Sequence, residues 1–189
     1  MTTLAPTLSS RYFPRTATWL RELMHITIGA LFVAALAQVK IPLPFTPVPL
    51  TGQTFAVLLV GAALGSKRGA ASLALYMAMG AFGLPFFAGG ASGLAYLSGA
   101  TLGYLVGFVG AAYVVGLLAE RGLERSVRTS LVPFVAGTLV IYLFGAGWLA
   151  ILLGAEKAFT MGILPFIPGD VIKLILAALA LPAAWKLVK

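Results

Sequence analysis

Long apolar stretches, separated by short basic clusters, dominate this sequence. They cover residues 23–39, 53–64, 70–84, 96–119, 131–153 and 170–188. A helix needs about 20 apolar residues to cross the hydrocarbon core of a bilayer, and fewer where it lies against protein. The second and third stretches are shorter than that length, so their boundaries are the least defined. We predict an all-α polytopic membrane protein, folded as a six-transmembrane-helix bundle.

The composition supports this class and excludes several functions. Hydrophobic residues make up 60% of the chain and charged residues 10%, whereas soluble domains carry about 25% charged residues. Cysteine is absent and His25 is the one histidine. Thiolate metal sites are therefore impossible, and a serine nucleophile would lack a histidine base at membrane depth. We expect no enzymatic activity, no cofactor and no metal.

The net charge of +8 follows membrane topology and does not predict binding to nucleic acid. Basic residues collect in the segments that alternate stretches share, and cytoplasmic loops of membrane proteins carry such an excess. These residues are Arg11, Arg15, Arg21, Lys67, Arg68, Arg121, Arg125, Arg128, Lys186 and Lys189. Only Lys40, Lys157 and Lys173 fall on the other side. We predict that both termini are cytoplasmic, that residues 1–22 form a loose cytoplasmic tail, and that residues 23–189 form one six-helix membrane domain.

Three connections on the opposite side are apolar and rich in proline or glycine. Residues 40–53 contain four prolines within eight positions, which favour a stiff, extended segment. Residues 85–93 are rich in glycine, and residues 154–168 contain a short apolar run of their own. Non-helical backbone near membrane depth is tolerated only where protein or a wet cavity surrounds it. We expect these loops to form the lid of a pocket that is open to this side.

Asp170 and Lys173 are opposite charges at the start of the last apolar stretch, just after Pro168 and Gly169. Residues at i and i+3 lie on one face of a helix, so the two side chains should project together. Charges inside a membrane protein usually face the bundle interior or a cavity and are functional by default. We predict that they contact a ligand. The alternative is an ion pair at the membrane surface that only anchors the helix.

Other candidate ligand contacts lie near the predicted lid. Gln53 follows the proline-rich loop and carries both a donor and an acceptor, although a polar residue at a helix end is an equal explanation. Tyr96 and Tyr104 are eight residues apart on the predicted fourth span and so share roughly one helix face; tyrosines in membrane proteins also form interfacial belts. Phe45 could supply an apolar wall or pack in the loop. Gly90 lies in a loop whose glycines allow close backbone approach.

Ala30 and Ala34 are four residues apart on the first predicted span. Small residues at this spacing let another helix approach closely. They are candidates for docking a partner protein, and packing within the chain is the alternative. The run from Gly61 to Lys67 lacks the Gly-Lys-Ser/Thr of a nucleotide-binding loop, so the chain cannot use ATP by that route.

Four stretches, in this order, resemble the BioY family, the biotin-binding S-components of energy-coupling factor (ECF) transporters. They are Phe45-Thr46-Pro47-Val48-Pro49-Leu50-Thr51-Gly52-Gln53-Thr54, Gly83-Leu84-Pro85 with Gly89-Gly90, Gly103-Tyr104-Leu105-x-Gly107-Phe108, and Pro165-Phe166-Ile167-Pro168-Gly169-Asp170-x-x-Lys173. The resemblance spans nearly the whole membrane region. Residues 98–102 depart from it, because many relatives carry a proline after the first glycine there.

The resemblance implies a six-helix subunit in a prokaryotic plasma membrane that captures biotin from outside. Its implied partners are a transmembrane coupling protein and two cytoplasmic ATPases. It also implies that Asp170 and Lys173 contact the ligand and that small residues of the first helix, here Ala30 and Ala34, dock the coupling protein. Alternative functions are an S-component for another vitamin, a membrane scaffold without a ligand, and a membrane enzyme, which the scarcity of catalytic residues disfavours.

Overall fold

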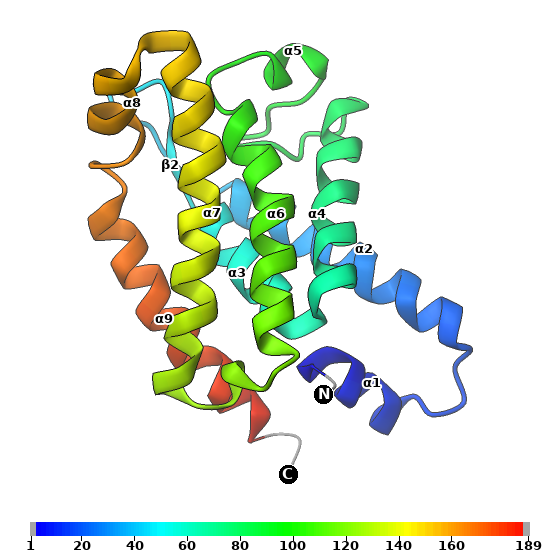
Figure 1. Cartoon of the computed structure of the whole chain (residues 1–189). Coiled ribbons are helices and arrows are strands. Elements are labelled where there is room, and N and C mark those ends of the chain that lie inside the picture. Colours follow the sequence, from blue (N-terminus) through cyan, green and yellow to red (C-terminus); the bar gives the residue numbers. More distant parts are fainter. Residues whose placement is uncertain (1–2, 187–189) are drawn as a thin grey trace.

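The computed structural model describes residues 3–186, and most of them form helices that stand side by side (Figure 1). The bundle contains α2 (Thr18–Ala37), α3 (Gln53–Leu64), α4 (Ser66–Ala81), α6 (Leu102–Ala119), α7 (Val127–Leu153) and α9 (Ile167–Trp185). Of the helices in the described part, α2, α6, α7 and α9 are long and apolar enough to cross a membrane, and α3 is apolar but shorter. The helical membrane class is thus confirmed.

Short elements cover the two ends of the bundle. They are α1 (Leu4–Tyr12), α5 (Leu94–Leu97), a 3-10 turn η1 (Leu123–Arg125), α8 (Ala155–Gly162), and the strands β1 (Lys40–Ile41) and β2 (Leu50–Thr51). The strands pair antiparallel, with Lys40 opposite Thr51. This two-stranded ribbon is a small departure from the all-α prediction, and its four intervening prolines explain why the segment is extended.

The helices begin earlier than the apolar stretches predict. The start of α2 lies at Thr18, within the predicted tail, and α7 starts at Val127. Polar residues are accommodated there because the first turn of a helix has free N–H groups to satisfy. The Ser126 hydroxyl accepts a hydrogen bond from the backbone N–H of Thr129 and so caps α7. The predicted end of the last span at residue 188 lies outside the described residues.

Two predicted segments were wrong in their secondary structure. Residues 4–12 form helix α1 instead of a loose tail, and Leu4 is buried against the bundle. The predicted fourth span is interrupted between α5 and α6, where the Leu102 N–H bonds to the carbonyl oxygen of Gly99. The indole N–H of Trp148 on α7 also donates to that oxygen at 3.0 Å and so holds the turn in place.

Helix α6 lies in the middle of the bundle and packs closely against α7. Glycines make this approach possible: a Cβ atom at Gly103 would lie 2.4 Å from the carbonyl oxygen of Phe144, and one at Gly145 would lie 2.3 Å from the ring of Tyr104. The absence of a side chain at these glycines therefore lets α6 and α7 pack in direct backbone contact.

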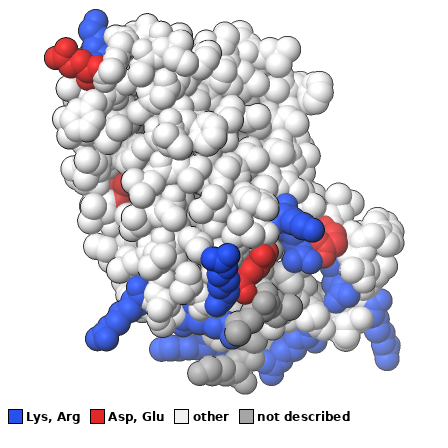
Figure 2. Space-filling view, viewed as in Figure 1, with Lys and Arg blue, Asp and Glu red and all other residues white. Residues whose placement is uncertain are grey.

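The basic residues gather at one end of the bundle, as Figure 2 shows, and the middle of the visible face carries almost no charge. This basic end includes α1, the start of α2, the turn between α6 and α7, and the end of α9 (Figure 1). The corner between α3 and α4 lies there too. It turns at Gly65, whose φ is +89°, and the Glu120 carboxylate accepts hydrogen bonds from the Ser66 N–H and hydroxyl, both at 2.8 Å.

The opposite end is covered by residues 40–51, the proline ribbon, together with α5 and α8 (Figure 1). The hydroxyl of Thr46 in the ribbon donates to the carbonyl oxygen of Met161 in α8 at 2.7 Å. The Leu50 side chain lies next to Gly169, where a Cβ atom would meet it at 3.2 Å. The ribbon is therefore held against both α8 and the start of α9.

Candidate functional site

A cavity of about 40 Å³ lies under the proline ribbon, between α3, α6, α7 and α9. Apolar and aromatic side chains form most of its wall, and polar groups cluster on the side of α3 and α9. The lining residues are Val48, Pro49, Thr51, Gln53, Thr54, Tyr96, Thr101, Tyr104, Leu105, Phe108, Ile141, Tyr142, Phe166, Asp170 and Lys173. The predicted pocket beneath the apolar loops is thus present, although it is small.

Asp170 and Lys173 both line this cavity from the first turns of α9. A proline at the start of the helix has the φ angle that the first turn requires, and it places the pair at this depth. The Lys173 Nζ lies 3.1 Å from Asp170 Oδ1, and the two side chains are 16% and 9% exposed. Their predicted contact on one helix face is confirmed. They face a cavity and are largely buried, which disfavours the alternative of a surface anchor.

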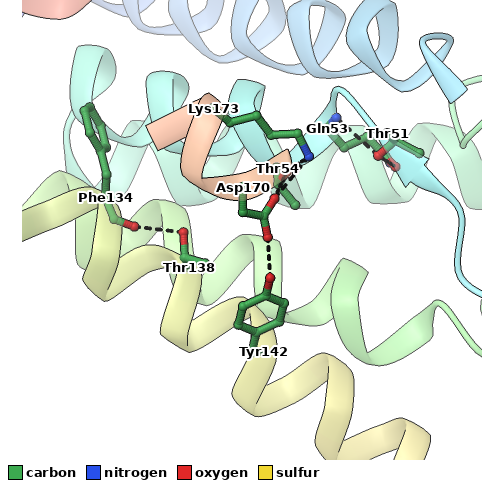
Figure 3. A network of polar contacts seen from close by, with 8 residues as sticks. All are labelled: Thr51, Gln53, Thr54, Phe134, Thr138, Tyr142, Asp170 and Lys173. Carbon is green, nitrogen blue, oxygen red and sulfur yellow. Dashed lines mark hydrogen bonds and ion pairs between the residues drawn. The ribbon is translucent and has the colours of Figure 1, made fainter. Parts of the chain in front are cut away.

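Two residues that the sequence analysis missed complete a polar network around this pair (Figure 3). Thr54 of α3 accepts a hydrogen bond from Lys173 Nζ at 2.8 Å and donates to Asp170 Oδ1 at 3.4 Å. The hydroxyl of Tyr142 on α7 donates to Asp170 Oδ2. The network therefore joins three helices that are far apart in the sequence. The available signal for Tyr142 was a phenol in the middle of an otherwise apolar span.

The hydrogen bonds explain how two charges persist among apolar side chains. A buried ion pair is tolerated only when its geometry is good and further hydrogen bonds satisfy the remaining donors and acceptors. Here both Asp170 oxygens have donors, and Asp170 also lies in the first turn of α9, where the helix dipole stabilises negative charge. The network presents a carboxylate acceptor and an ammonium donor side by side.

Gln53 also lines the cavity, but its amide already has protein partners. Its Nε2 donates to the Tyr76 hydroxyl at 2.6 Å, and its Oε1 accepts from the Thr51 hydroxyl at 2.8 Å. These bonds connect the end of the proline ribbon to α4. They leave Gln53 at the wall of the cavity and fix its orientation.

Tyr96 and Tyr104 both line the cavity, though not from one helix as predicted. Tyr96 belongs to α5, and its ring stacks on Phe87 at a centroid distance of 4.9 Å. Tyr104 belongs to α6, and its hydroxyl donates to the Gly162 carbonyl oxygen in α8 at 2.8 Å. The turn between α5 and α6 separates the two residues in the chain, and packing returns both rings to the same cavity.

Phe45 and Gly90 do not reach the cavity. Phe45 lies in the turn between the two strands of the ribbon, where its side chain is 57% exposed. Gly90 is exposed and adopts a φ of +79° within the turn in which the Phe87 N–H bonds to the Ala91 carbonyl oxygen. The glycine is needed for that backbone conformation. In this structure neither residue is placed to contact a ligand in the cavity.

Ala30 and Ala34 are buried inside the bundle, at 0% and 6% exposure. They lie on the face of α2 that packs inward, next to Gly29, where a Cβ atom would lie 2.5 Å from the Ser72 hydroxyl oxygen of α4. Their burial favours the alternative of packing within the chain, and the docking of a partner protein at these residues stays a prediction. Close packing within the chain, the alternative, is what their small side chains permit.

The polar groups of the cavity are arranged so that they could hydrogen-bond a small molecule. The described residues contain no group of three metal-ligating side chains, so Asp170 has no companions with which to hold an ion. A small molecule with adjacent N–H donors and a carbonyl acceptor would complement the carboxylate and the ammonium group, and an apolar portion would fit the aromatic wall.

Known proteins with similar sequences belong to one family. A family model described as the BioY family matches residues 6–189. The biotin transporter BioY of Rhizobium etli is 40% identical over 169 residues, covering 84% of this chain and 90% of that protein. The probable biotin transporter BioY of Pyrococcus horikoshii is 44% identical over 150 residues, covering 79% and 88%.

The fold has a counterpart among solved structures as well. The crystal structure of the S-component for biotin from an ECF-type ABC transporter superposes with a TM-score of 0.81 at 26% identity, covering 90% of this chain and 95% of that chain. The family match, over residues 6–189, includes the α9 segment that carries the charged pair. The chain described here is a member of the BioY family.

Proposed function

We propose that this protein is the biotin-binding S-component of an ECF-type transporter. It spans the plasma membrane of a prokaryote with six helices and keeps the basic end, with both termini, in the cytoplasm. The observation that carries the proposal is the polar network of Asp170, Lys173, Thr54 and Tyr142 in an otherwise apolar cavity. The names of its relatives support biotin as the ligand.

The network matches the polar head of biotin. The ureido group of biotin carries two N–H donors and one carbonyl oxygen. In our proposal the Asp170 carboxylate accepts from the N–H groups, and Lys173 lies near the ureido oxygen or balances the aspartate. Hydrogen bonds to charged groups each contribute about 1.5–3 kcal/mol. The apolar part of the ligand then lies against Tyr96, Tyr104 and their neighbours.

In our proposal the small cavity under the ribbon must widen to admit the ligand. A volume of about 40 Å³ accommodates only a few water molecules, because one water needs roughly 10–15 Å³ by this measure. A vitamin therefore enters only when part of the wall moves. We assign this movement to the proline ribbon, which is held to α8 through the bond between Thr46 and Met161. A transmembrane coupling protein and two cytoplasmic ATPases then drive release to the inside.

Titration of the purified protein with biotin tests this site. Asp170→Asn and Lys173→Met should each weaken binding roughly tenfold or more, because each removes a charge-assisted bond. The matched control is Thr138→Val. Thr138 lies one turn from Tyr142 on α7, but its hydroxyl bonds to the Phe134 carbonyl oxygen of its own helix (Figure 3). If both charge variants bind biotin as the wild-type protein does, the assignment of the site is wrong.

A further inference from the structure

An apolar groove of about 500 Å³ lies at the basic end of the bundle, between α1, α2, α3 and α9. It shares no lining residue with the cavity under the proline ribbon. Along α2 it extends from His25 to Phe32, which is about 10 Å at 1.5 Å per residue. Its other walls are apolar side chains such as Leu8 of α1 and Leu59 of α3. The groove is thus elongated along α2 and lined mostly by apolar side chains.

Exposed aromatic side chains surround the mouth of the groove. Tyr12 and Phe13 line it and are 64% and 59% exposed, and Trp19 at the start of α2 is 69% exposed. Exposed tyrosine and tryptophan side chains are typical of the membrane–water interface, where lipid head groups lie. From there the groove continues along α2 to the apolar residues Ile28 and Phe32.

A positive charge lies beside this mouth. A smaller cavity of about 160 Å³ adjoins the groove, and Arg21 lines that smaller cavity. The two cavities share the lining residues Ser9, Phe13, His25 and Ile28. The neighbouring Glu22 forms its ion pair with Arg68 of α4, through two hydrogen bonds, and among the described residues it forms none with Arg21.

His25 adds a polar atom that needs a partner. Its Nδ1 is buried and has no hydrogen-bond partner among residues 3–186, and His25 lines both the groove and the smaller cavity. A buried polar atom without a partner costs free energy, and a phosphate oxygen would accept a hydrogen bond from it once the imidazole ring turns its N–H toward the cavity. The junction of the two cavities therefore combines a cation, an unsatisfied imidazole nitrogen and an apolar channel.

We propose that the groove binds one acyl chain of an anionic phospholipid and that the phosphate lies against Arg21 and His25. The length and apolar lining suit an acyl chain, and the charge at the mouth suits a phosphate. Basic pockets between membrane helices bind anionic lipid head groups in this way. The lipid would fill the space between α1 and the bundle and so stabilise the position of α1.

Native mass spectrometry of the delipidated protein tests the proposal with two defined lipids, phosphatidylglycerol and phosphatidylcholine of the same chains. The wild-type protein should retain phosphatidylglycerol in preference to phosphatidylcholine. Arg21→Gln should reduce that preference roughly fivefold, since one basic residue near a membrane surface contributes about 1 kcal/mol. Arg128→Gln is the matched control, because Arg128 is exposed at the start of α7 and lines neither cavity.

A second pair of variants tests the groove itself. Ala180 of α9 is exposed and lines the groove, so Ala180→Trp fills the space without disturbing the core, and it should abolish adducts of both lipids. Ala183→Trp, on an exposed position outside the groove, should not. Equal retention of the two lipids by the wild-type protein, or unchanged adducts in Ala180→Trp, would overturn the proposal. Biotin titration of the same variants should be unchanged, which separates this proposal from the proposed function.

Discussion

Neutralising Asp170 and Lys173 separately and together distinguishes a structural role of the pair from a binding role. The pair is largely buried and its charged atoms are 3.1 Å apart. Removing one partner of a buried ion pair typically costs 3–5 kcal/mol, because the other charge is left uncompensated. Thr54 and Tyr142 still contact the remaining charge, so we expect the lower end of that range, roughly 3 kcal/mol, for Asp170→Asn or for Lys173→Met.

The double variant Asp170→Asn/Lys173→Met carries no buried charge at this site. Its stability should therefore return to within about 1 kcal/mol of the wild-type value, since replacing a whole buried pair is often neutral. Biotin affinity should not return. Losing two charge-assisted hydrogen bonds, at about 1.5 kcal/mol or more each, weakens binding roughly 100-fold.

Unfolding in mixed micelles with an increasing fraction of sodium dodecyl sulfate measures the stability, and calorimetric titration measures the affinity. A double variant that is stable and binds biotin within a few-fold of the wild-type protein would refute the binding role. Single variants as stable as the wild-type protein would refute the burial of the pair.

Three further predictions follow from the packing of the chain. Thr46→Val removes the bond from the proline ribbon to Met161 and should raise the rates of biotin association and dissociation in stopped-flow measurements; unchanged rates would exclude the ribbon as the moving wall. Gly116→Ala should destabilise the fold by about 1–3 kcal/mol, because its Cβ would lie 2.2 Å from a backbone nitrogen of the α3–α4 corner, whereas Gly147→Ala, with open space around it, should not. Burial raises the pKa of the Glu124 carboxyl above its ordinary value of 4.5, so the folded state favours the protonated form and loses stability as the pH rises through the raised pKa. Glu124→Gln should therefore be more stable than the wild-type protein at alkaline pH and lose that advantage below pH 4.5; a pH-independent difference would contradict this reading.

Local spacing was enough to predict the charged half of the site. Asp170 and Lys173 belong to one helix, and helical geometry alone places residues i and i+3 together. Thr54 and Tyr142 were missed because their approach depends on how α3 and α7 pack against α9. Glycines permit part of that packing: a Cβ atom at Gly137 of α7 would lie 2.7 Å from the Leu58 side chain of α3. The positions of apolar spans in a sequence do not show which face of each helix points toward the other helices.

The remaining errors have similar physical causes. Residues 96–119 form one continuous apolar stretch, so the sequence did not show the turn that separates Tyr96 from Tyr104. That turn is held by a hydrogen bond from the Trp148 indole N–H, on another helix, to the Gly99 carbonyl oxygen. The spacing of Ala30 and Ala34 correctly indicated close helix packing, but spacing does not specify whether the neighbour is a partner protein or α4. Resemblance to the family supplied the ligand, which the residues alone left open.

Competition binding of labelled biotin to the purified wild-type protein, with an excess of unlabelled biotin, riboflavin or thiamin, tests whether biotin is the ligand. We expect saturable binding of one biotin per chain that only unlabelled biotin displaces. Displacement by riboflavin or thiamin, or the absence of saturable biotin binding, would show that the ligand assignment is wrong.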